Sequence, residues 1–282
     1  MMIKNLRGLM TIRGIIALDI DGTIVDYPKP LSRSFVAYVE KLFQDGWQLL
    51  FATGRTEEWA LSLLSSLSCP FFLAAYNGAR LVSVPHHEEI YSHEMKGASL
   101  GEYRQLFLSF GAVCYTKNQG VFFCPAVTYS YIDQHLQARR QQQKEEWQIV
   151  QSIEAVAEMR LLSVRVFASP LEALMVSRTL SASFHAPVMR DAFDENIHIV
   201  QLTDGVTSKG QALLALKERF SPKIVIAAGN DGNDLELLQY ADIRVAVGNA
   251  PAEIQQIATD TIDSSVEITE GLERAVLSAE GC

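Results

Sequence analysis

The stretch Ile15-Ile16-Ala17-Leu18-Asp19-Ile20-Asp21-Gly22-Thr23 decides the fold of this 282-residue chain. Its first four residues are all apolar, which is typical of a strand that is buried on both faces of a parallel sheet. Gly22 then lets the backbone turn sharply. Because ligands of open parallel sheets bind outside the carboxyl ends of the strands, Asp19 and Asp21 lie where a binding site is expected.

Strand and helix patterns alternate on both sides of this stretch. Short apolar runs predict strands, and apolar residues at helical spacing between them predict helices. The predicted strands are 15–18, 48–52, 71–75, 224–228 and 243–247, and the predicted helices are 34–43, 57–67, 209–220, 235–240 and 253–258. This order predicts an α/β protein with a Rossmann-like parallel-sheet core of three layers, α/β/α.

The middle of the chain follows a different pattern. Two strand-like runs, 113–115 and 121–124, flank Lys117-Asn118-Gln119-Gly120, which favours a hairpin turn. Further strands are predicted at 161–168, 186–189 and 196–202, and helices at 129–147 and 171–183. Hairpins combined with helices predict an α+β cap domain inserted at residues 82–186, which leaves a discontinuous core of residues 1–81 and 187–282.

The composition excludes several classes of protein. With 48% hydrophobic residues the chain can bury a core, and its net charge of −9 argues against a general binder of nucleic acid or anionic membranes. No run of about 18 apolar residues indicates a membrane span, and the N-terminal residues lack the apolar segment of a signal peptide. The four cysteines form no CxxC pair, which fits a reducing, cytoplasmic compartment.

Asp19 and Asp21 can divide the chemistry of a hydrolytic reaction between them. An aspartate can form an aspartyl-phosphate, and a neighbouring carboxyl group can protonate a leaving oxygen and then activate water. Asp19 is therefore the candidate nucleophile and Asp21 the candidate acid/base. The simpler alternative is a turn in which aspartates cap a helix.

Polar residues also follow other strands or open a helix. Gly229-Asn230-Asp231-Gly232-Asn233-Asp234 crowds oxygen ligands after an apolar run, which suits Mg²⁺, although a helix N-cap in such a loop is a common alternative. Thr53 and Gly54 follow another predicted strand and can hold phosphoryl oxygens, whose charge Lys209 can balance. Taken singly, Thr53 is most simply a capping residue and Lys209 a surface lysine.

In this order the four segments resemble the motifs of the haloacid dehalogenase superfamily of phosphohydrolases. The resemblance implies that Asp19 is the nucleophile, that Asp21 is the acid/base, and that Thr53, Gly54 and Lys209 bind phosphate. It assigns the metal to Asp19, Asp21 (through its carbonyl), Asn230 and Asp234. The position of the inserted segment resembles the C2-type cap of the Cof-like subfamily, IIB. The motifs and their neighbours add Gly22, Arg55, Asn77, Asp231, Asn233 and Asn249 as candidates.

One position departs from the family pattern. The fourth motif usually begins Gly-Asp, and this chain has Gly229-Asn230 instead. An amide oxygen can still contact Mg²⁺, but one negative charge is lost, so we expect weaker metal binding unless Asp231 compensates.

The resemblance implies a Mg²⁺-dependent phosphatase that hydrolyses a small phosphorylated metabolite, such as a sugar phosphate, through an aspartyl-phosphate. Two alternatives stay open: a phosphotransferase or phosphomutase on the same core, and a catalytically silent binding protein. Neither nucleic acid nor membrane is an expected partner, and the oligomeric state is not predicted. No motif marks the residues that select the substrate. Arg165 and Arg190 are candidates for that contact, although surface cations are the simpler interpretation.

Overall fold

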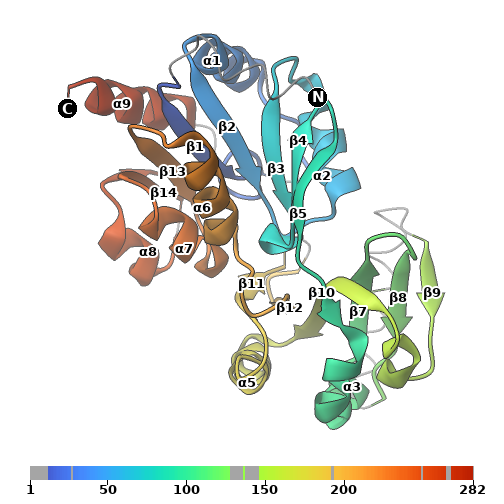
Figure 1. Ribbon diagram of the computed structural model, residues 1–282. Coiled ribbons are helices and arrows are strands. Elements are labelled where there is room, and N and C mark those ends of the chain that lie inside the picture. The colour runs from blue at the N-terminus through green and yellow to red at the C-terminus, as the bar shows by residue number, and fades with distance from the viewer. Residues whose placement is uncertain are drawn as a thin grey trace. The chain divides into compact units, whose positions relative to one another are not determined.

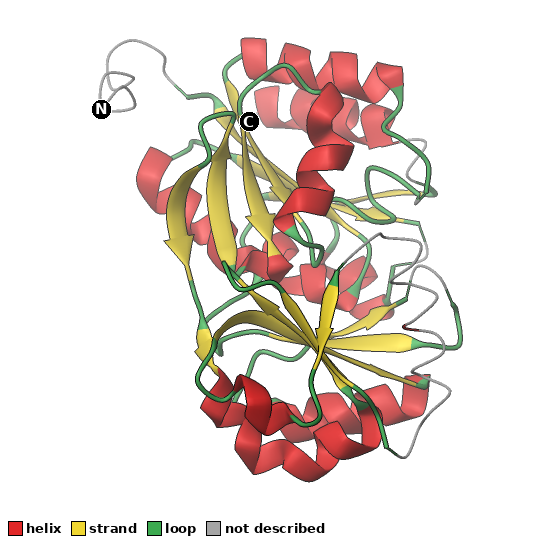
Figure 2. Cartoon of the chain, turned by 90° about the vertical axis from the view of Figure 1, so that its right-hand side faces the viewer, coloured by secondary structure: helices red, strands yellow, loops and turns green. Residues whose placement is uncertain are grey.

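The computed structural model describes residues 12–26, 28–127, 136, 146–191, 194–248, 250–264 and 268–281. The chain divides into two compact units (Figure 1). The discontinuous unit runs to Ile90 and resumes at Lys209, and the inserted unit is Tyr91–Ser208. Each unit has a sheet of its own, drawn in yellow in Figure 2.

An eight-stranded sheet forms the centre of the discontinuous unit. Its strand order is β15-β14-β13-β1-β2-β3-β4-β5. The strands are β1 (Gly14–Asp19), β2 (Trp47–Ala52), β3 (Phe71–Ala75), β4 (Arg80–Val84), β5 (Glu88–Ser92), β13 (Val225–Gly229), β14 (Ile243–Val247) and β15 (Asp260–Ile262). Neighbours from β15 to β3 pair in parallel, and β4 turns back antiparallel to β3. The prediction of a parallel-sheet α/β core is confirmed.

Helices flank this sheet on both faces, which makes three layers (Figure 1). They are α1 (Arg33–Gln44), α2 (Glu57–Leu63), α6 (Lys209–Phe220), α7 (Leu235–Gln239), α8 (Ala252–Ile257) and α9 (Ile268–Glu280). From β1 the chain first moves outward through β2 and β3, and later from β13 through β14 and β15 in the opposite direction. Since crossovers are right-handed, this reversal creates a switch point between β1 and β13, where ligands of such sheets bind.

Local sequence explains why these elements form. Every residue of β1 is buried, as its uninterrupted apolar run predicts. Helix α1 begins after Ser32, whose side chain accepts a hydrogen bond from the backbone N–H of Phe35. It buries Phe35, Val39 and Leu42, which repeat at helical spacing.

The inserted unit contains a second, mainly antiparallel sheet with the order β11-β12-β10-β7-β8-β9, to which β6 adds beside β10. Its strands are β6 (Met95–Lys96), β7 (Ala112–Thr116), β8 (Val121–Cys124), β9 (Trp147–Ile149), β10 (Arg160–Ala168), β11 (Val188–Arg190) and β12 (His198–Leu202). Helices α3 (Arg104–Phe110) and α5 (Pro170–Leu180) pack on one face of this sheet, over a core that includes Val164, Val166 and Leu202. The predicted hairpin is confirmed, since β7 and β8 pair antiparallel.

The expected limits of the inserted module, residues 82–186, differ from those in the structure. Strand β4 begins at Arg80 and extends the first sheet instead of opening the insertion. The sequence pattern assigns strands β11 and β12 to the core, but β12 pairs with β10 of the second sheet and β11 pairs with β12. Strand pairing is a long-range choice that a local pattern does not encode. The predicted helix over 129–147 falls almost entirely outside the described residues, and Trp147 begins β9.

We found no helix that is both long enough and apolar enough to cross a membrane among those the structure describes.

Candidate active site

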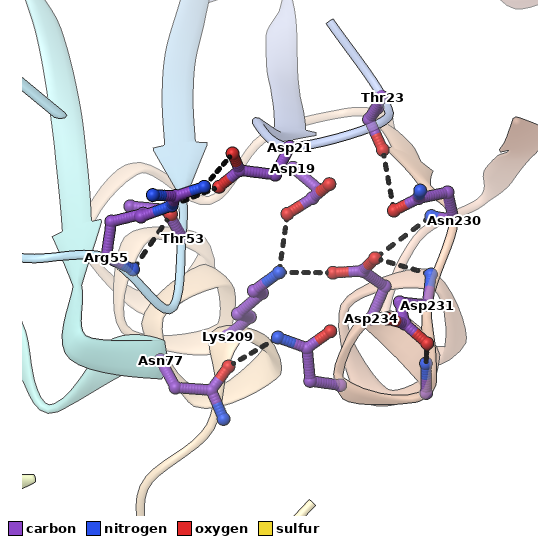
Figure 3. A network of polar contacts seen from close by, with 12 residues as sticks. Asp19, Asp21, Thr23, Thr53, Arg55, Asn77, Lys209, Asn230, Asp231 and Asp234 are labelled. Carbon is purple, nitrogen blue, oxygen red and sulfur yellow. Dashed lines mark hydrogen bonds and ion pairs between the residues drawn. The ribbon is translucent and has the colours of Figure 1, made fainter. Parts of the chain in front are cut away.

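The candidate active site lies in the discontinuous unit, at the carboxyl ends of its parallel strands (Figure 3). Asp19 ends β1, Thr53 follows β2, and the loop 230–234 follows β13. Lys209 is the first residue of α6. Figure 3 shows side chains from these four segments gathered around Lys209. Segments that are far apart in the sequence thus meet at the switch point of the sheet.

Lys209 connects two carboxylates at the centre of the site. Its Nζ lies 2.5 Å from Asp19 Oδ1 and 2.6 Å from Asp234 Oδ1. The exposed fractions are 4% for Asp19, 1% for Lys209 and 0% for Asp234, so these charges are shielded from water. Charge-assisted hydrogen bonds of this kind offset the cost of burying each charge. The interpretation of Lys209 as a surface lysine is therefore wrong.

Burial changes the proton affinities of this cluster. Burial and then the charge of Asp234 raise the pKa of Asp19 to about 7, against the lowering effect of Lys209. Burial alone would lower the pKa of Lys209, but Asp19 and Asp234 outweigh it, and the pKa rises above its ordinary value. Lys209 is therefore a fixed positive charge, and it offsets only in part the cost of burying the negative charge of Asp19.

Within the part of the chain that the structure describes, one oxygen of Asp19 has no hydrogen-bond partner. Asp19 Oδ2 is buried and unpaired, although its sister atom Oδ1 accepts from Lys209. A buried carboxylate oxygen without a donor is costly. Oxygen donors of Asp and Asn side chains suit a hard cation such as Mg²⁺, which would satisfy this atom. Within the described part of the chain, no three His, Cys, Asp or Glu side chains already form a metal-binding cluster.

The loop after β13 is held by Asp234 itself. Its Oδ2 accepts hydrogen bonds from the backbone N–H groups of Asn230 (2.9 Å) and Asp231 (3.0 Å). The carboxylate of Asp231 caps the following turn by accepting from the N–H of Gly232 at 2.8 Å. In Figure 3 this carboxylate points away from Lys209. Asp231 thus acts as the capping residue of the loop, and its geometry does not support compensation for Asn230.

Asn230 lies directly over the turn that follows β1. Thr23 Oγ1 donates to Asn230 Oδ1 at 3.4 Å. Gly22 has a φ of +80°, and a Cβ on it would lie 2.2 Å from Asn230 Nδ2. Glycine thus suits position 22 because of its backbone conformation, and it leaves room for the Asn230 side chain as placed here.

Asp21 is held by Arg55 and not by the Lys209 cluster. Arg55 Nε lies 3.1 Å from Asp21 Oδ2, and Arg55 Nη2 lies 2.9 Å from Oδ1. The guanidinium stacks on Trp59, with Cζ 4.2 Å from the ring centroid. The sequence patterns do not predict this contact of Trp59. Arg55 precedes Thr56, the N-cap of α2, and Trp59 lies in the first turn of that helix, so the helical spacing rule does not apply to this pair.

The remaining candidates lie beside this group. Thr53 is fully buried, and its Oγ1 accepts from the N–H of Arg55 at 3.0 Å, so the hydroxyl proton is not used in that contact. Gly54 lies between them in the same turn. Asn77, after β3, donates its N–H to the Thr53 carbonyl at 2.8 Å, and its Oδ1 accepts from Asn233 Nδ2 at 3.0 Å. Asn249 lies outside the described residues.

Comparison with known proteins identifies the family. The family model described as haloacid dehalogenase-like hydrolase matches residues 16–275. The chain belongs to this family. As the motifs predicted, it is therefore a haloacid dehalogenase-like hydrolase, and the match spans both units of the chain.

Individual relatives of this haloacid dehalogenase-like hydrolase are distant in sequence and similar in length. It is 23% identical to the 5-amino-6-(5-phospho-D-ribitylamino)uracil phosphatase YitU of Bacillus subtilis over 90% of this chain and 93% of that protein. It is 25% identical to the phosphoglycolate phosphatase of Methanothermobacter thermautotrophicus over 93% and 96%. The solved structure of the subclass IIB sugar phosphatase BT4131 has a TM-score of 0.71 at 17% identity, covering 93% of this chain and 98% of that one. This likeness agrees with the expected Cof-like fold.

Proposed function

We propose that this protein is a Mg²⁺-dependent phosphatase that hydrolyses a small phosphorylated metabolite through an aspartyl-phosphate on Asp19. The observation that carries the proposal is the buried Asp19, which ends β1, is held through one oxygen by Lys209 and keeps its other oxygen unpaired. Nucleophilic catalysis requires a positioned carboxylate. With Oδ2 available to a cation, Oδ1, which Lys209 holds, is the oxygen that attacks phosphorus.

In the first step, Asp19 attacks phosphorus in line with the ester bond. A bond forms between the Asp19 oxygen and phosphorus while the bond from phosphorus to the alcohol oxygen breaks. Asp21 in its protonated form gives its proton to the leaving alcohol. Lys209 and the Thr53 hydroxyl hold the phosphoryl oxygens, because both groups are donors at the carboxyl edge of the sheet.

In the second step, water hydrolyses the aspartyl-phosphate. Asp21, now a carboxylate, takes a proton from water as the water oxygen bonds to phosphorus. The bond between phosphorus and Asp19 breaks, inorganic phosphate leaves, and both aspartates return to their starting protonation states.

We assign a Mg²⁺ ion to Asp19, the carbonyl of Asp21, Asn230 and Asp234. Bound Mg²⁺ supplies positive charge that polarises a phosphoryl oxygen and reduces repulsion between the phosphate and the carboxylates. Both oxygens of Asp234 already accept hydrogen bonds, so Asp19 Oδ2 is the ligand atom best supported by the contacts.

The substrate class follows from the relatives, whose names describe phosphatases of a ribityl phosphate, of phosphoglycolate and of sugar phosphates. We therefore propose a small phosphorylated metabolite as substrate, with the inserted unit as its C2-type cap. A cytoplasmic location stays a prediction that rests on the cysteine pattern.

The test is phosphate release from a panel of phosphorylated metabolites and from p-nitrophenyl phosphate, with Mg²⁺ and with EDTA. We expect free phosphate that depends on Mg²⁺ and that disappears in Asp19→Asn. Asp45→Asn is the matched control, because Asp45 is a partly exposed carboxylate paired with Lys41 on the same unit. A phosphorylated acceptor in place of free phosphate would identify a transferase, and no turnover of any ester would support a silent binding protein.

A further inference from the structure

Arg55 and Asp21 form a bidentate ion pair next to Asp19, the proposed nucleophile (Figure 3). The two hydrogen bonds, 3.1 Å from Nε and 2.9 Å from Nη2, engage both oxygens of the carboxylate. The side chain of Arg55 is 8% exposed and that of Asp21 is 28% exposed. A planar guanidinium that contacts both oxygens fixes the rotation of a carboxylate as well as its position.

Three further contacts fix Arg55, one through its guanidinium and two through its backbone. Trp59 lies under its guanidinium at 4.2 Å from the ring centroid. Its backbone N–H donates to Thr53 Oγ1 at 3.0 Å, and its carbonyl accepts from the N–H of Tyr76 at 2.9 Å. The turn that carries Thr53 thus also fixes the origin of the Arg55 side chain.

Asp21 lies in a loop that cannot orient its carboxylate alone. It follows β1 by two residues and precedes Gly22, whose positive φ starts the turn. The backbone of this turn closes through the N–H of Gly22 on the Val25 carbonyl at 2.8 Å, which fixes the main chain but not the side chain. Among the contacts described for Asp21, the Arg55 fork is the one that constrains its carboxylate.

We propose that Arg55 is a positioning residue that orients the Asp21 carboxyl group for proton transfer to the leaving alcohol. The proposal rests on the phosphatase function proposed above. A displaced acid loses catalytic efficiency even when it keeps its charge state, because proton transfer requires hydrogen-bond distance to the leaving oxygen. Lysine keeps the charge but offers no planar fork, so it should replace arginine only in part.

The test compares two phosphate esters whose leaving groups need acid catalysis to different degrees. p-Nitrophenyl phosphate releases a stabilised phenolate and needs little protonation, whereas benzyl phosphate releases a poor leaving group that needs it. The measurement is kcat/KM, which reports steps up to phosphoryl transfer to Asp19. For Arg55→Gln we expect a loss of roughly 10- to 100-fold on benzyl phosphate and less than about threefold on p-nitrophenyl phosphate. Arg55→Lys should fall between Arg55→Gln and the native enzyme on benzyl phosphate.

The ratio of the two kcat/KM values within one variant is independent of the folded fraction, so a partly unfolded preparation still gives an answer. Arg80→Gln is the matched control, because Arg80 is a partly buried arginine of the same unit that pairs with Glu57 and Glu89. We expect Arg80→Gln to leave the ratio unchanged.

The double variant Asp21→Asn/Arg55→Gln completes the test. If Arg55 acts through Asp21, the double variant should be within about threefold of Asp21→Asn alone on benzyl phosphate. Equal losses on both esters, or losses that multiply in the double variant, would overturn the inference and assign Arg55 to phosphate binding or to folding. If the native enzyme hydrolyses neither ester nor any member of the metabolite panel, it is the proposed function that fails.

Discussion

The two sheets of this protein place their buried polar side chains in opposite ways. In the discontinuous unit, Asp19 ends strand β1, Asp234 lies in the loop after β13, and both meet Lys209 at the carboxyl edge. In the inserted unit, Ser163 and Arg165 lie in the middle of β10 and are buried within an antiparallel sheet. In a parallel sheet with a switch point, the short loops that follow the strands lie together and form a site. On the face of an antiparallel sheet, neighbouring side chains come from different strands.

Arg165 illustrates the consequence. The interpretation of Arg165 as a surface cation is wrong, because the residue is 3% exposed. Its Nη1 donates to Tyr115 Oη at 3.2 Å, and its Cζ lies 4.7 Å from the centroid of the Tyr115 ring. Both faces of β10 are buried, so alternation along the strand did not separate an inner face from a solvent face. Polar residues that follow a strand in one short loop can therefore be recognised in the sequence. Single polar residues buried within a sheet, such as Arg165, cannot.

The largest expected effect comes from replacing Asp19, the proposed nucleophile, in the parallel-sheet site. Asp19→Asn should lower kcat by at least about 10³-fold, because Asn cannot form the aspartyl-phosphate. The fold should persist, since Asn keeps an oxygen that can accept from Lys209 and removes a charge that burial opposes. Steady-state kinetics with a thermal melt in EDTA checks both expectations. Near-native activity in a folded Asp19→Asn protein would break the assignment of the site.

The next effect concerns the stability that Lys209 provides. Lys209→Met leaves Asp19 and Asp234 buried without their shared cation, and losing one partner of a buried pair costs about 3–5 kcal/mol. Lys217 on the same helix is the matched control, because its Nζ donates to a backbone carbonyl, that of Tyr240, at 2.7 Å. Lys217→Met should cost about 1 kcal/mol. Urea denaturation measures both, and equal costs would mean that the central cluster is not held by Lys209.

The difference between the two sheets also explains which features can be predicted from the sequence. The strand over 15–18 was predicted because its apolar run is local, and β1 confirms it. Asp19, Thr53 and Asp234 were placed at strand ends by the same local patterns, and the structure brings them to one edge. Three features depend on long-range information: the burial of Lys209, the bidentate contact of Arg55 with Asp21, and the addition of β12 and β11 to the sheet beside β10. These depend on which segments meet, and propensity does not encode that.

Asn230 offers a way to sharpen the comparison by changing one charge in the site. Asn230→Asp restores a carboxylate above the turn at Gly22, beside Asp234. Greater ligand charge should lower the Mg²⁺ concentration for half-maximal activity by about tenfold. Without Mg²⁺, the added like charge should lower the melting temperature, so the stabilisation by Mg²⁺ should grow. Activity titrations and melts with and without Mg²⁺ report this, and an unchanged Mg²⁺ requirement would exclude Asn230 from the metal site.

The smallest effect separates two glycines, one from each unit, that share a left-handed backbone. Gly22 has φ +80° and Gly120, in the β7–β8 turn, has φ +93°. Alanine at either position should cost about 1–2 kcal/mol because of the backbone conformation. Only at Gly22 would the new Cβ overlap the Asn230 amide, at 2.2 Å from Nδ2, whereas at Gly120 the nearest atom is at 3.4 Å. The Asn230 side chain can move aside, so the added consequence of Gly22→Ala should be a higher Mg²⁺ requirement and not a further loss of stability. If Gly120→Ala raises the Mg²⁺ requirement equally, the contact between Gly22 and Asn230 does not shape the proposed metal site. The proposed difference in role between the turns of the two units is then wrong.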